Sequence, residues 1–425
     1  MNIAYRKLSV ATALFGLSAL ASAVQAAGFV EDSHASLTFR NYLFDRNYLG
    51  ETNIAARREW AQGFILKVNS GFTEGPVGFG LDALGLVGIK LDSSRDRVGT
   101  GLLPIGSNGE APDQYGELGL TAKVRYSKTQ LDLGTQYPQL PILFASPTRL
   151  LPQTFRGAYL RSQDIDRLSL HVGWLDRVNQ RDSTDYQKLT VGAPNGRFNP
   201  KAESDRFLFV GGDYALTPEL TLRYYHASLQ DIYVQDYLGA VHTIPLGPGK
   251  LKSDFRYFLS DEDGSAKAGA VDNQNIGAMF SYSIGAHTLG AGVMHSSGDT
   301  AMPYIAGSEP LWHSEGALST EFLNAKERAW QVKYDYDFTQ VGLPGLRAMA
   351  RYLKGTNIEV PRFGGDGLSE SERDLEVSYV VQSGPLKNVA FRVRNALYLN
   401  DFAPNASFRD DNETRINIDY TLALW

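Results

Sequence analysis

The sequence of 425 residues contains no cysteine, carries fewer basic than acidic residues, and has no long apolar run beyond residue 26. The lack of cysteine excludes a disulfide scaffold and a thiolate metal site, and it fits an oxidising compartment. The shortage of basic residues, 41 Lys and Arg against 47 Asp and Glu, disfavours a general nucleic-acid-binding protein. A transmembrane helix needs about 18 apolar residues, so none is expected after residue 26.

Sequence signatures of common enzymes and cofactor sites are also missing. There is no HExxH, P-loop or dinucleotide-binding motif, and the seven histidines show no metal-ligand spacing. We therefore expect neither a metal nor a cofactor. His295, Ser296, Ser297 and Asp299 lie close together in sequence, which raises the alternative of a serine hydrolase. Catalytic triads converge in space rather than along one loop, so this alternative is disfavoured.

The N-terminus has the pattern of a secretory signal peptide. Arg6 and Lys7 precede an apolar run that ends in small residues at 24–26. We expect cleavage after Ala26, which leaves 27–425 as one mature domain and moves its formal charge from −6 to −8. Serine and threonine interrupt the run, which argues against the alternative of an N-terminal membrane anchor. In so acidic a protein, any cluster of basic residues needs an explanation.

Apolar and polar residues alternate with a period of two through nearly the whole mature chain, as at 118–127, 167–175 and 415–425. Short connections alternate with nine longer ones, near residues 48, 100, 145, 190, 235, 265, 310, 362 and 405. Nine such loops joining pairs of strands predict an all-β fold, an 18-stranded antiparallel transmembrane β-barrel in the outer membrane of a Gram-negative bacterium. A soluble β-sandwich or propeller would show the same alternation. The signal peptide, the unequal connections and the C-terminal Trp425 favour the barrel.

Basic residues gather on the polar faces of the predicted strands. In the stretch 390–398, Phe391 and Val393 lie on one face and Arg392 and Arg394 on the other. Two such guanidinium groups are roughly 7 Å apart and repel by about 2.4 kcal/mol at an effective dielectric constant of 20. A visiting carboxylate would relieve this repulsion. The same parity predicts a row of lumenal cations, formed by Arg40, Lys123, Arg125, Arg161, Arg351, Arg392, Arg394 and Arg415.

For each arginine taken singly, the alternative is a solvated side chain or one paired with a lumenal carboxylate such as Asp132 or Glu376. The acidic residues are otherwise expected in loops and turns, including 260–264, 369–374 and 409–413.

Two long connections are unusually apolar. The stretch 134–156 carries seven large apolar residues and four prolines, and it would promote aggregation if exposed. We expect it to fold into the barrel and narrow the pore. The alternative is packing against a neighbouring protomer, and the pattern leaves a monomer and a weak trimer both open. The loop 298–328, with Tyr304, Leu311 and Trp312, is the second candidate for infolding.

The mature chain resembles the OprD/Occ family of outer-membrane carboxylate channels. The resemblance rests on stretches such as FVEDSHASLTFRNYLFDR, REWAQGFILKVNSGFTEGPVGFGLDALGLVGIKLD, RLLPQTFRG, VVQSGPLKNVAFRVRNA and NETRINIDYTLALW. The compact loops and KLDSSRDRVGTGLLP are nearest the OccK branch. The resemblance implies a substrate-specific porin with a lumenal basic ladder and a constriction formed largely by the third and seventh extracellular loops. Carried onto this sequence, the constriction falls on Arg149, Arg156, Leu143, Phe144 and Pro147.

We therefore expect passive uptake of small carboxylate-containing solutes, including aromatic ones, without chemistry. The expected partners are small organic acids, outer-membrane lipid and lipopolysaccharide, and no nucleic acid. A general diffusion porin with a weak anion preference is the alternative, but it would lack the apolar, proline-stiffened loop. A plugged receptor would need an N-terminal domain ahead of the first strand, and that strand begins soon after residue 26.

Overall fold

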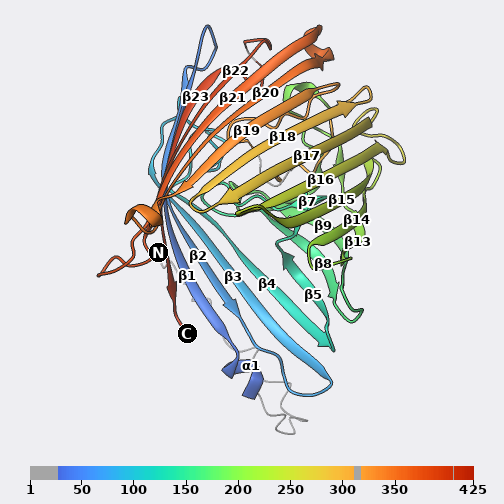
Figure 1. Cartoon of the computed structure of the whole chain (residues 1–425), viewed down its shortest axis with the longest axis vertical. Helices are drawn as coiled ribbons and strands as arrows, with labels where there is room; N and C mark the ends of the chain where they lie inside the picture. Colours follow the sequence, from blue (N-terminus) through green and yellow to red (C-terminus); the bar gives the residue numbers. More distant parts are fainter. Residues whose placement is uncertain (1–26, 311–316, 405) are drawn as a thin grey trace, which may run out of the picture.

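The computed structural model describes residues 27–310, 317–404 and 406–425. Eighteen long strands follow one another in chain order around a tilted cylinder (Figure 1). They are β1 (His34–Tyr48), β2 (Ala56–Asn69), β3 (Val77–Asp92), β4 (Gln114–Tyr126), β5 (Thr129–Gln136), β8 (Thr154–Ser162), β9 (Leu168–Asn179), β13 (Phe207–Ala215), β14 (Leu220–Leu229), β15 (Tyr233–Leu246), β16 (Gly249–Glu262), β17 (Asp272–Ile284), β18 (His287–Ser297), β19 (Arg328–Asp337), β20 (Leu346–Val360), β21 (Gly365–Val380), β22 (Ala390–Asn400) and β23 (Asp411–Ala423).

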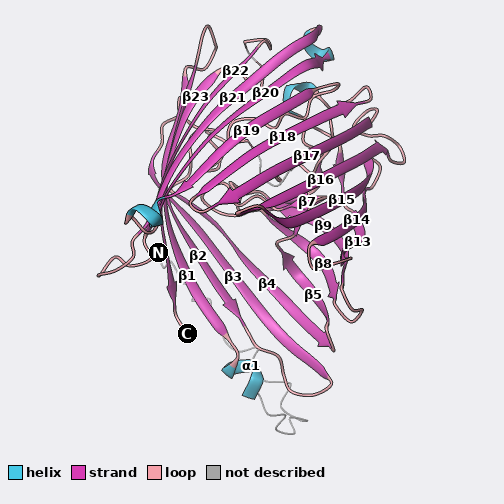
Figure 2. Cartoon of the chain, in the orientation of Figure 1, coloured by secondary structure: helices cyan, strands magenta, loops and turns pink. Residues whose placement is uncertain are grey.

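The remaining elements are short (Figure 2). Two-residue strands lie in the loops, and β10 extends the main sheet beside β9. None of the helices in the described part of the chain is long and apolar enough to cross a bilayer. These elements are α1 (Ala27–Glu31), β6 (Gln139–Leu140), β7 (Leu143–Phe144), β10 (Tyr186–Gln187), β11 (Leu189–Thr190), β12 (Glu203–Ser204), η1 (Pro194–Gly196), η2 (Phe338–Val341) and η3 (Pro361–Phe363).

The barrel closes where the first strand meets the last. β1 pairs antiparallel with β2 on one side and with β23 on the other, from Ser36 opposite Ala423 to Tyr48 opposite Asp411. Closure leaves no row of unpaired backbone groups, which hydrocarbon could not satisfy. The predicted 18-stranded antiparallel barrel is confirmed.

The two faces of the wall differ as the alternation predicts. Side chains that point outward form an exposed apolar belt, and the intervening residues of the same strands are buried inside. On β22, for example, Val393 is 46% exposed on the outer face and Arg394 is 9% exposed on the inner face. The outward belt includes Leu118, Leu120, Val172, Trp174, Leu208, Val210, Leu238, Ile276, Leu289, Val293, Trp330, Val332, Leu375 and Val377.

The connections differ from the expected lengths at two places. The connections near 235 and 362 were expected to be long, but they span only 230–232 and 361–364. Strand pairing continues to Leu229 opposite Tyr233 and to Val360 opposite Gly365. Residues that were expected in these loops therefore belong to the strands. The other long connections lie at one end of the barrel, which is the extracellular end by the usual asymmetry.

The loop between β5 and β8, residues 137–153, folds into the barrel. Arg40 of β1 donates from Nη1 to the Arg149 carbonyl at 3.0 Å, and the Tyr42 hydroxyl donates to the Thr148 carbonyl at 3.2 Å. Leu150 packs over Gly63 of β2, where an added Cβ would lie only 3.1 Å from the Leu150 Cγ. The glycine therefore leaves room for the loop against the inner wall.

The loop between β18 and β19, residues 298–327, also packs inside. Its Glu309 accepts hydrogen bonds from Ser146 at 2.5 Å and Thr148 at 2.8 Å, both in the 137–153 loop. Tyr304 is buried and donates to Glu321 within the same loop. Leu311 and Trp312 lie outside the described residues. The predicted infolding of both loops is confirmed for the parts that the structure describes.

The prediction that the acidic residues of 369–374 and 409–413 lie in loops holds for Asp410 but is wrong for the other five. Glu370, Glu372 and Asp374 belong to β21, and Asp411 and Glu413 belong to β23. All five are buried on the inner face. Their charge suggested a solvated loop, but a barrel interior can pair carboxylates with lumenal cations and loop N–H groups.

Candidate functional site

The candidate site is a cavity of about 690 Å³, which we call the main cavity. It lies between the two infolded loops and the inner wall formed by β1, β22 and β23. Among the described residues its lining includes six arginines and three carboxylates. The arginines are Arg46, Arg57, Arg149, Arg181, Arg394 and Arg415, and the carboxylates are Asp182, Glu309 and Glu321.

Aromatic side chains of β1 support these arginines. The Phe44 ring contacts three guanidinium groups, with its centroid 4.6 Å from the Cζ of Arg415, 5.1 Å from that of Arg149 and 5.3 Å from that of Arg46. The neighbouring lumenal residue, Tyr42, accepts a hydrogen bond from Arg394 at 3.1 Å. Aromatic faces attract cations without neutralising them, so they hold the arginines in place and leave the positive charge available.

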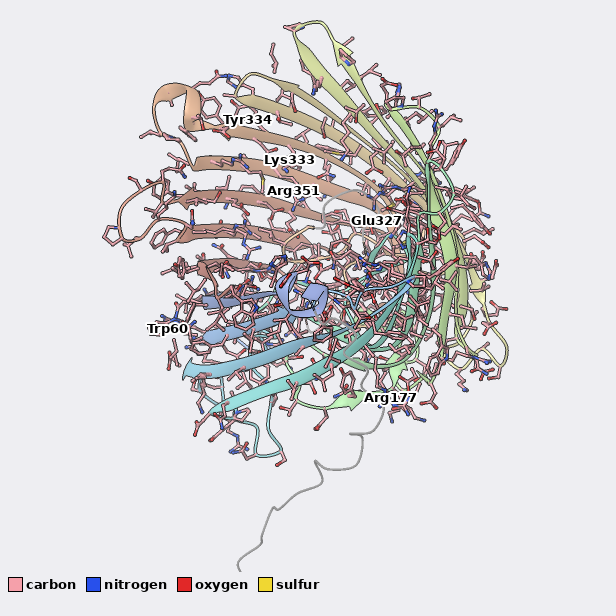
Figure 3. All side chains as sticks on the ribbon, turned by 90° about the horizontal axis from the view of Figure 1, so that it is seen from below. Trp60, Arg177, Glu327, Lys333, Tyr334 and Arg351 are labelled. Atoms are coloured by element: carbon pink, nitrogen blue, oxygen red, sulfur yellow. The ribbon has the colours of Figure 1, made fainter. Side chains whose placement is uncertain are left out.

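Six of the eight predicted lumenal cations form ion pairs with carboxylates on the inner wall. Arg351 of β20, which is labelled in Figure 3, and Asp374 form the least exposed of these pairs. These pairs correspond to the alternative in which a lumenal arginine pairs with a carboxylate. They include both carboxylates that the sequence suggested, Asp132 and Glu376. The pairs are Arg40 with Asp419 at 2.9 Å, Lys123 with Asp82 at 2.5 Å, Arg161 with Asp132 at 2.5 Å, Arg351 with Asp374 at 2.6 Å, Arg392 with Glu376 at 3.4 Å and Arg415 with Glu413 at 2.6 Å.

The two remaining predicted cations have other surroundings. Arg125 lies over the Phe72 ring at 4.1 Å. Arg394 donates from Nη2 to the Asn417 side chain at 2.9 Å as well as to Tyr42, and it lines the main cavity.

Three arginines of the main cavity have no ion pair with a carboxylate within the described part of the chain: Arg57, Arg149 and Arg394. The Nε donors of Arg57 and Arg394 are buried without a hydrogen-bond acceptor. Burial lowers the pKa of the Arg149 guanidinium well below its usual value, and the charges of Arg181 and Arg415 lower it further. Buried donors and like charges of this kind are costly unless an anion meets them.

Only some of the residues expected at the constriction line the main cavity. Phe144, Pro147 and Arg149 line the main cavity. Leu143 is buried in the apolar packing beneath the loop. Arg156 lies at the start of β8, pairs with Asp176 and is about half exposed. Three of the five residues carried over from the family resemblance therefore line the main cavity, whereas side-chain direction within the loop could not be inferred from the sequence.

Sequence reasoning missed several residues of this site. Arg46 and Arg57 share the lumenal parity of their strands, and Tyr42 and Phe44 share the parity of Arg40, so alternation could have identified all four. Arg181 follows β9 in a loop, where no parity applies.

The geometry argues against Ser296 as the nucleophile of the hydrolase alternative. Ser296 is fully buried on the inner face, where the Asn273 amide donates to its hydroxyl at 2.8 Å, whereas His295 is exposed on the outer face. A strand keeps consecutive side chains on opposite sides, so this histidine cannot act as a base for that serine.

The comparisons with known proteins agree with the barrel fold. The family model described as outer membrane porin, OprD family, matches residues 27–424. A porin-like protein GalP of Pseudomonas putida is 38% identical over 401 residues, which cover 94% of each chain. The crystal structure of Pseudomonas aeruginosa OccK9 has a TM-score of 0.89 at 41% identity, covering 93% of this chain and all of that one.

The crystal structure of Pseudomonas aeruginosa OpdK with vanillate has a TM-score of 0.87 at 38% identity, covering 94% of this chain and all of that one. Members of the matched family are channels rather than enzymes, as the sequence led us to expect. The chain belongs to the OprD family of outer-membrane porins.

Proposed function

We propose that this porin is specific for small carboxylates that carry an apolar or aromatic body, and that it takes them up passively. The observation that carries the proposal is a set of three guanidinium groups on one cavity that have no carboxylate partner among the described residues, namely Arg57, Arg149 and Arg394. A carboxylate can accept two parallel N–H bonds from an arginine and would satisfy the buried donors.

The walls of the main cavity supply the apolar part of the site. Ile105, Phe144, Pro147, Leu318 and Phe408 line it beside the arginines. A volume of about 690 Å³ suits a small organic acid. The relative OpdK was crystallised with vanillate, an aromatic carboxylate, which supports the same solute class here.

From the main cavity, the path of the carboxylate toward the periplasmic end runs along the inner face of β22. Arg392 lies two residues beyond Arg394 on the inner face, and it lines a second cavity that reaches the short turn at Gly285 and Ala286. Arg392 is paired with Glu376 at 3.4 Å, a loose contact that an arriving carboxylate could replace. The transfer needs no cofactor.

The test measures uptake of labelled benzoate into liposomes that contain the purified protein. We expect Arg149→Ala with Arg394→Ala to lower uptake roughly tenfold, which corresponds to about 1.4 kcal/mol. Arg161→Ala, which removes a predicted lumenal cation that is paired with Asp132 outside the main cavity, is the matched control and should change uptake by about twofold or less.

Heat-modifiable mobility on gels shows whether each variant keeps its barrel. Uptake of neutral benzyl alcohol should be unchanged in the double variant. Equal loss for benzoate and benzyl alcohol would make the two arginines structural. Unchanged benzoate uptake in the double variant would favour a general diffusion porin with a weak anion preference.

The cleavage after Ala26 and the number of protomers stay predictions. Residues 1–26 lie outside the described chain.

A further inference from the structure

A row of basic side chains lies on the outer, lipid-facing side of the barrel wall. Arg328 of β19, Lys354 of β20 and Arg373 of β21 all have the parity of the outward residues Trp330 and Tyr352. Their strands are adjacent, so the row takes one cation from each. Figure 1 shows these three strands side by side.

The register sets the spacing of the row. Lys354 lies opposite Trp330, and Arg373 lies opposite Tyr352. Arg328 to Lys354 and Lys354 to Arg373 are therefore both diagonal neighbours, with Cβ atoms roughly 7 Å apart. This separation allows two or three of the cations to contact one phosphorylated headgroup.

The row lies at a defined height on the wall. Arg328 and Lys354 are each two residues nearer the extracellular end than Trp330 and Tyr352, whose ring centroids are 5.6 Å apart. Aromatic residues of this kind mark the boundary between hydrocarbon and headgroups. Arg328 and Lys354 therefore lie at the level of the outer-leaflet headgroups, and Arg373, opposite Tyr352, lies at the boundary just below them.

Contacts within the protein leave the charge of the row uncompensated. Arg328 has no ion pair within the described residues, and Arg373 donates to the Asn395 amide oxygen at 3.0 Å. Lys354 donates to the Ser369 hydroxyl at 3.0 Å, and that hydroxyl donates to Asp401 at 2.7 Å. Asp401 thus contacts the row only through a neutral serine.

We propose that Arg328, Lys354 and Arg373 bind the phosphate groups of a glycolipid in the outer leaflet, namely lipopolysaccharide. The acyl chains would lie over the apolar belt, with the sugar phosphates against the three cations. Arginine and lysine are the usual phosphate-binding side chains, and arginine can bind a phosphate with two parallel hydrogen bonds.

Arg58 on β2 provides a matched control within the same protein. It also faces outward, two residues from the exposed Trp60, but Asp45 lies opposite it with an N–O distance of 3.8 Å. Its charge is therefore partly compensated by a neighbouring carboxylate, and it stands outside the row.

The test uses the purified full-length porin in detergent and measures binding of diphosphoryl lipid A by native mass spectrometry. Arg328→Ala with Lys354→Ala and Arg373→Ala should weaken binding roughly tenfold or more, because two or three charge-assisted contacts are lost. Arg58→Ala should stay within about twofold of the unmodified protein. Benzoate uptake in liposomes should be unchanged in the triple variant, which also shows that it folds.

Three results would overturn the proposal. The first is unchanged lipid A affinity in the triple variant. The second is equal affinity for dephosphorylated lipid A, or complete displacement by inorganic phosphate, which would make the row a general anion site. The third is a change in the number of protomers without a change in lipid binding, which would make this face a contact between copies.

Discussion

At the residue scale, the arginines of the main cavity are held close together despite their like charges. Phe44 contacts guanidinium groups from three parts of the chain: Arg46 on its own strand, Arg149 in an infolded loop and Arg415 on the last strand. Each contact of this kind is worth about 0.5–2 kcal/mol and leaves the arginine charged. A carboxylate in the same place would hold the arginines more tightly, but it would cancel the positive charge that attracts an anionic solute.

We therefore expect Phe44→Leu to lower benzoate uptake by roughly threefold to tenfold, because the ring contacts that position the arginines are lost. Phe44→Tyr should keep most of the uptake, since its ring has a similar face. Phe258→Leu is the control, because that buried ring packs against Tyr237 at 4.8 Å instead of against a cation. Equal effects of the two leucine variants would mean that Phe44 acts through packing alone.

At the element scale, the 298–327 loop is attached to the wall by its backbone. The N–H groups of Leu318, Ser319 and Thr320 all donate to the Glu372 carboxylate, at 2.5, 3.0 and 3.1 Å. Arg415 donates to the Leu318 carbonyl at 2.5 Å from the neighbouring side. Since this part of the loop lines the main cavity, Glu372 is a positioning residue for the pore.

Glu372→Gln should loosen this attachment, because an amide has one acceptor oxygen and no charge, and hydrogen bonds to charged groups are worth about 1.5–3 kcal/mol each. We expect higher and noisier single-channel conductance in planar bilayers. Glu376→Gln, on the same strand but paired with Arg392 and away from the loop, should leave the noise unchanged. Quiet, unchanged traces for Glu372→Gln would show that other contacts hold the loop.

The sequence predicted the elements better than the contacts between them. Alternation was enough to place Arg392 and Arg394 on the inner face, because a strand fixes side-chain direction at every second residue. It could not show that Glu376 pairs with Arg392 while Arg394 has no carboxylate partner in the described part of the chain, since this depends on the register between strands. Stretches rich in acid, such as 369–374, were misassigned because a soluble protein would expose them.

At the scale of the whole molecule, net charge and pore charge have opposite signs. The chain carries a formal charge of −6, yet the main cavity is lined by six arginines and three carboxylates among its described residues. A permeating ion responds to the charges within a Debye length, about 10 Å at 0.1 M salt, rather than to the total. The acidic surface is therefore compatible with an anion-selective pore.

Reversal potentials in potassium chloride gradients should show a preference for chloride over potassium near 0.1 M salt. The preference should weaken near 1 M, where the Debye length falls to about 3 Å. It should also weaken in the double variant Arg149→Ala with Arg394→Ala. A potassium preference that persists in this variant would contradict an anion pathway through the main cavity.

The pairing of β1 with β23 also constrains how the protein is made. The seam joins Ser36 to Ala423, so the earliest strand waits for the latest one before either has its second neighbour. Contacts between residues so distant in sequence form slowly. Until they form, the first and last strands each expose an unpaired edge that can pair with other polypeptides. The edges of the first and last strands therefore stay exposed until both strands are available and the cylinder can close.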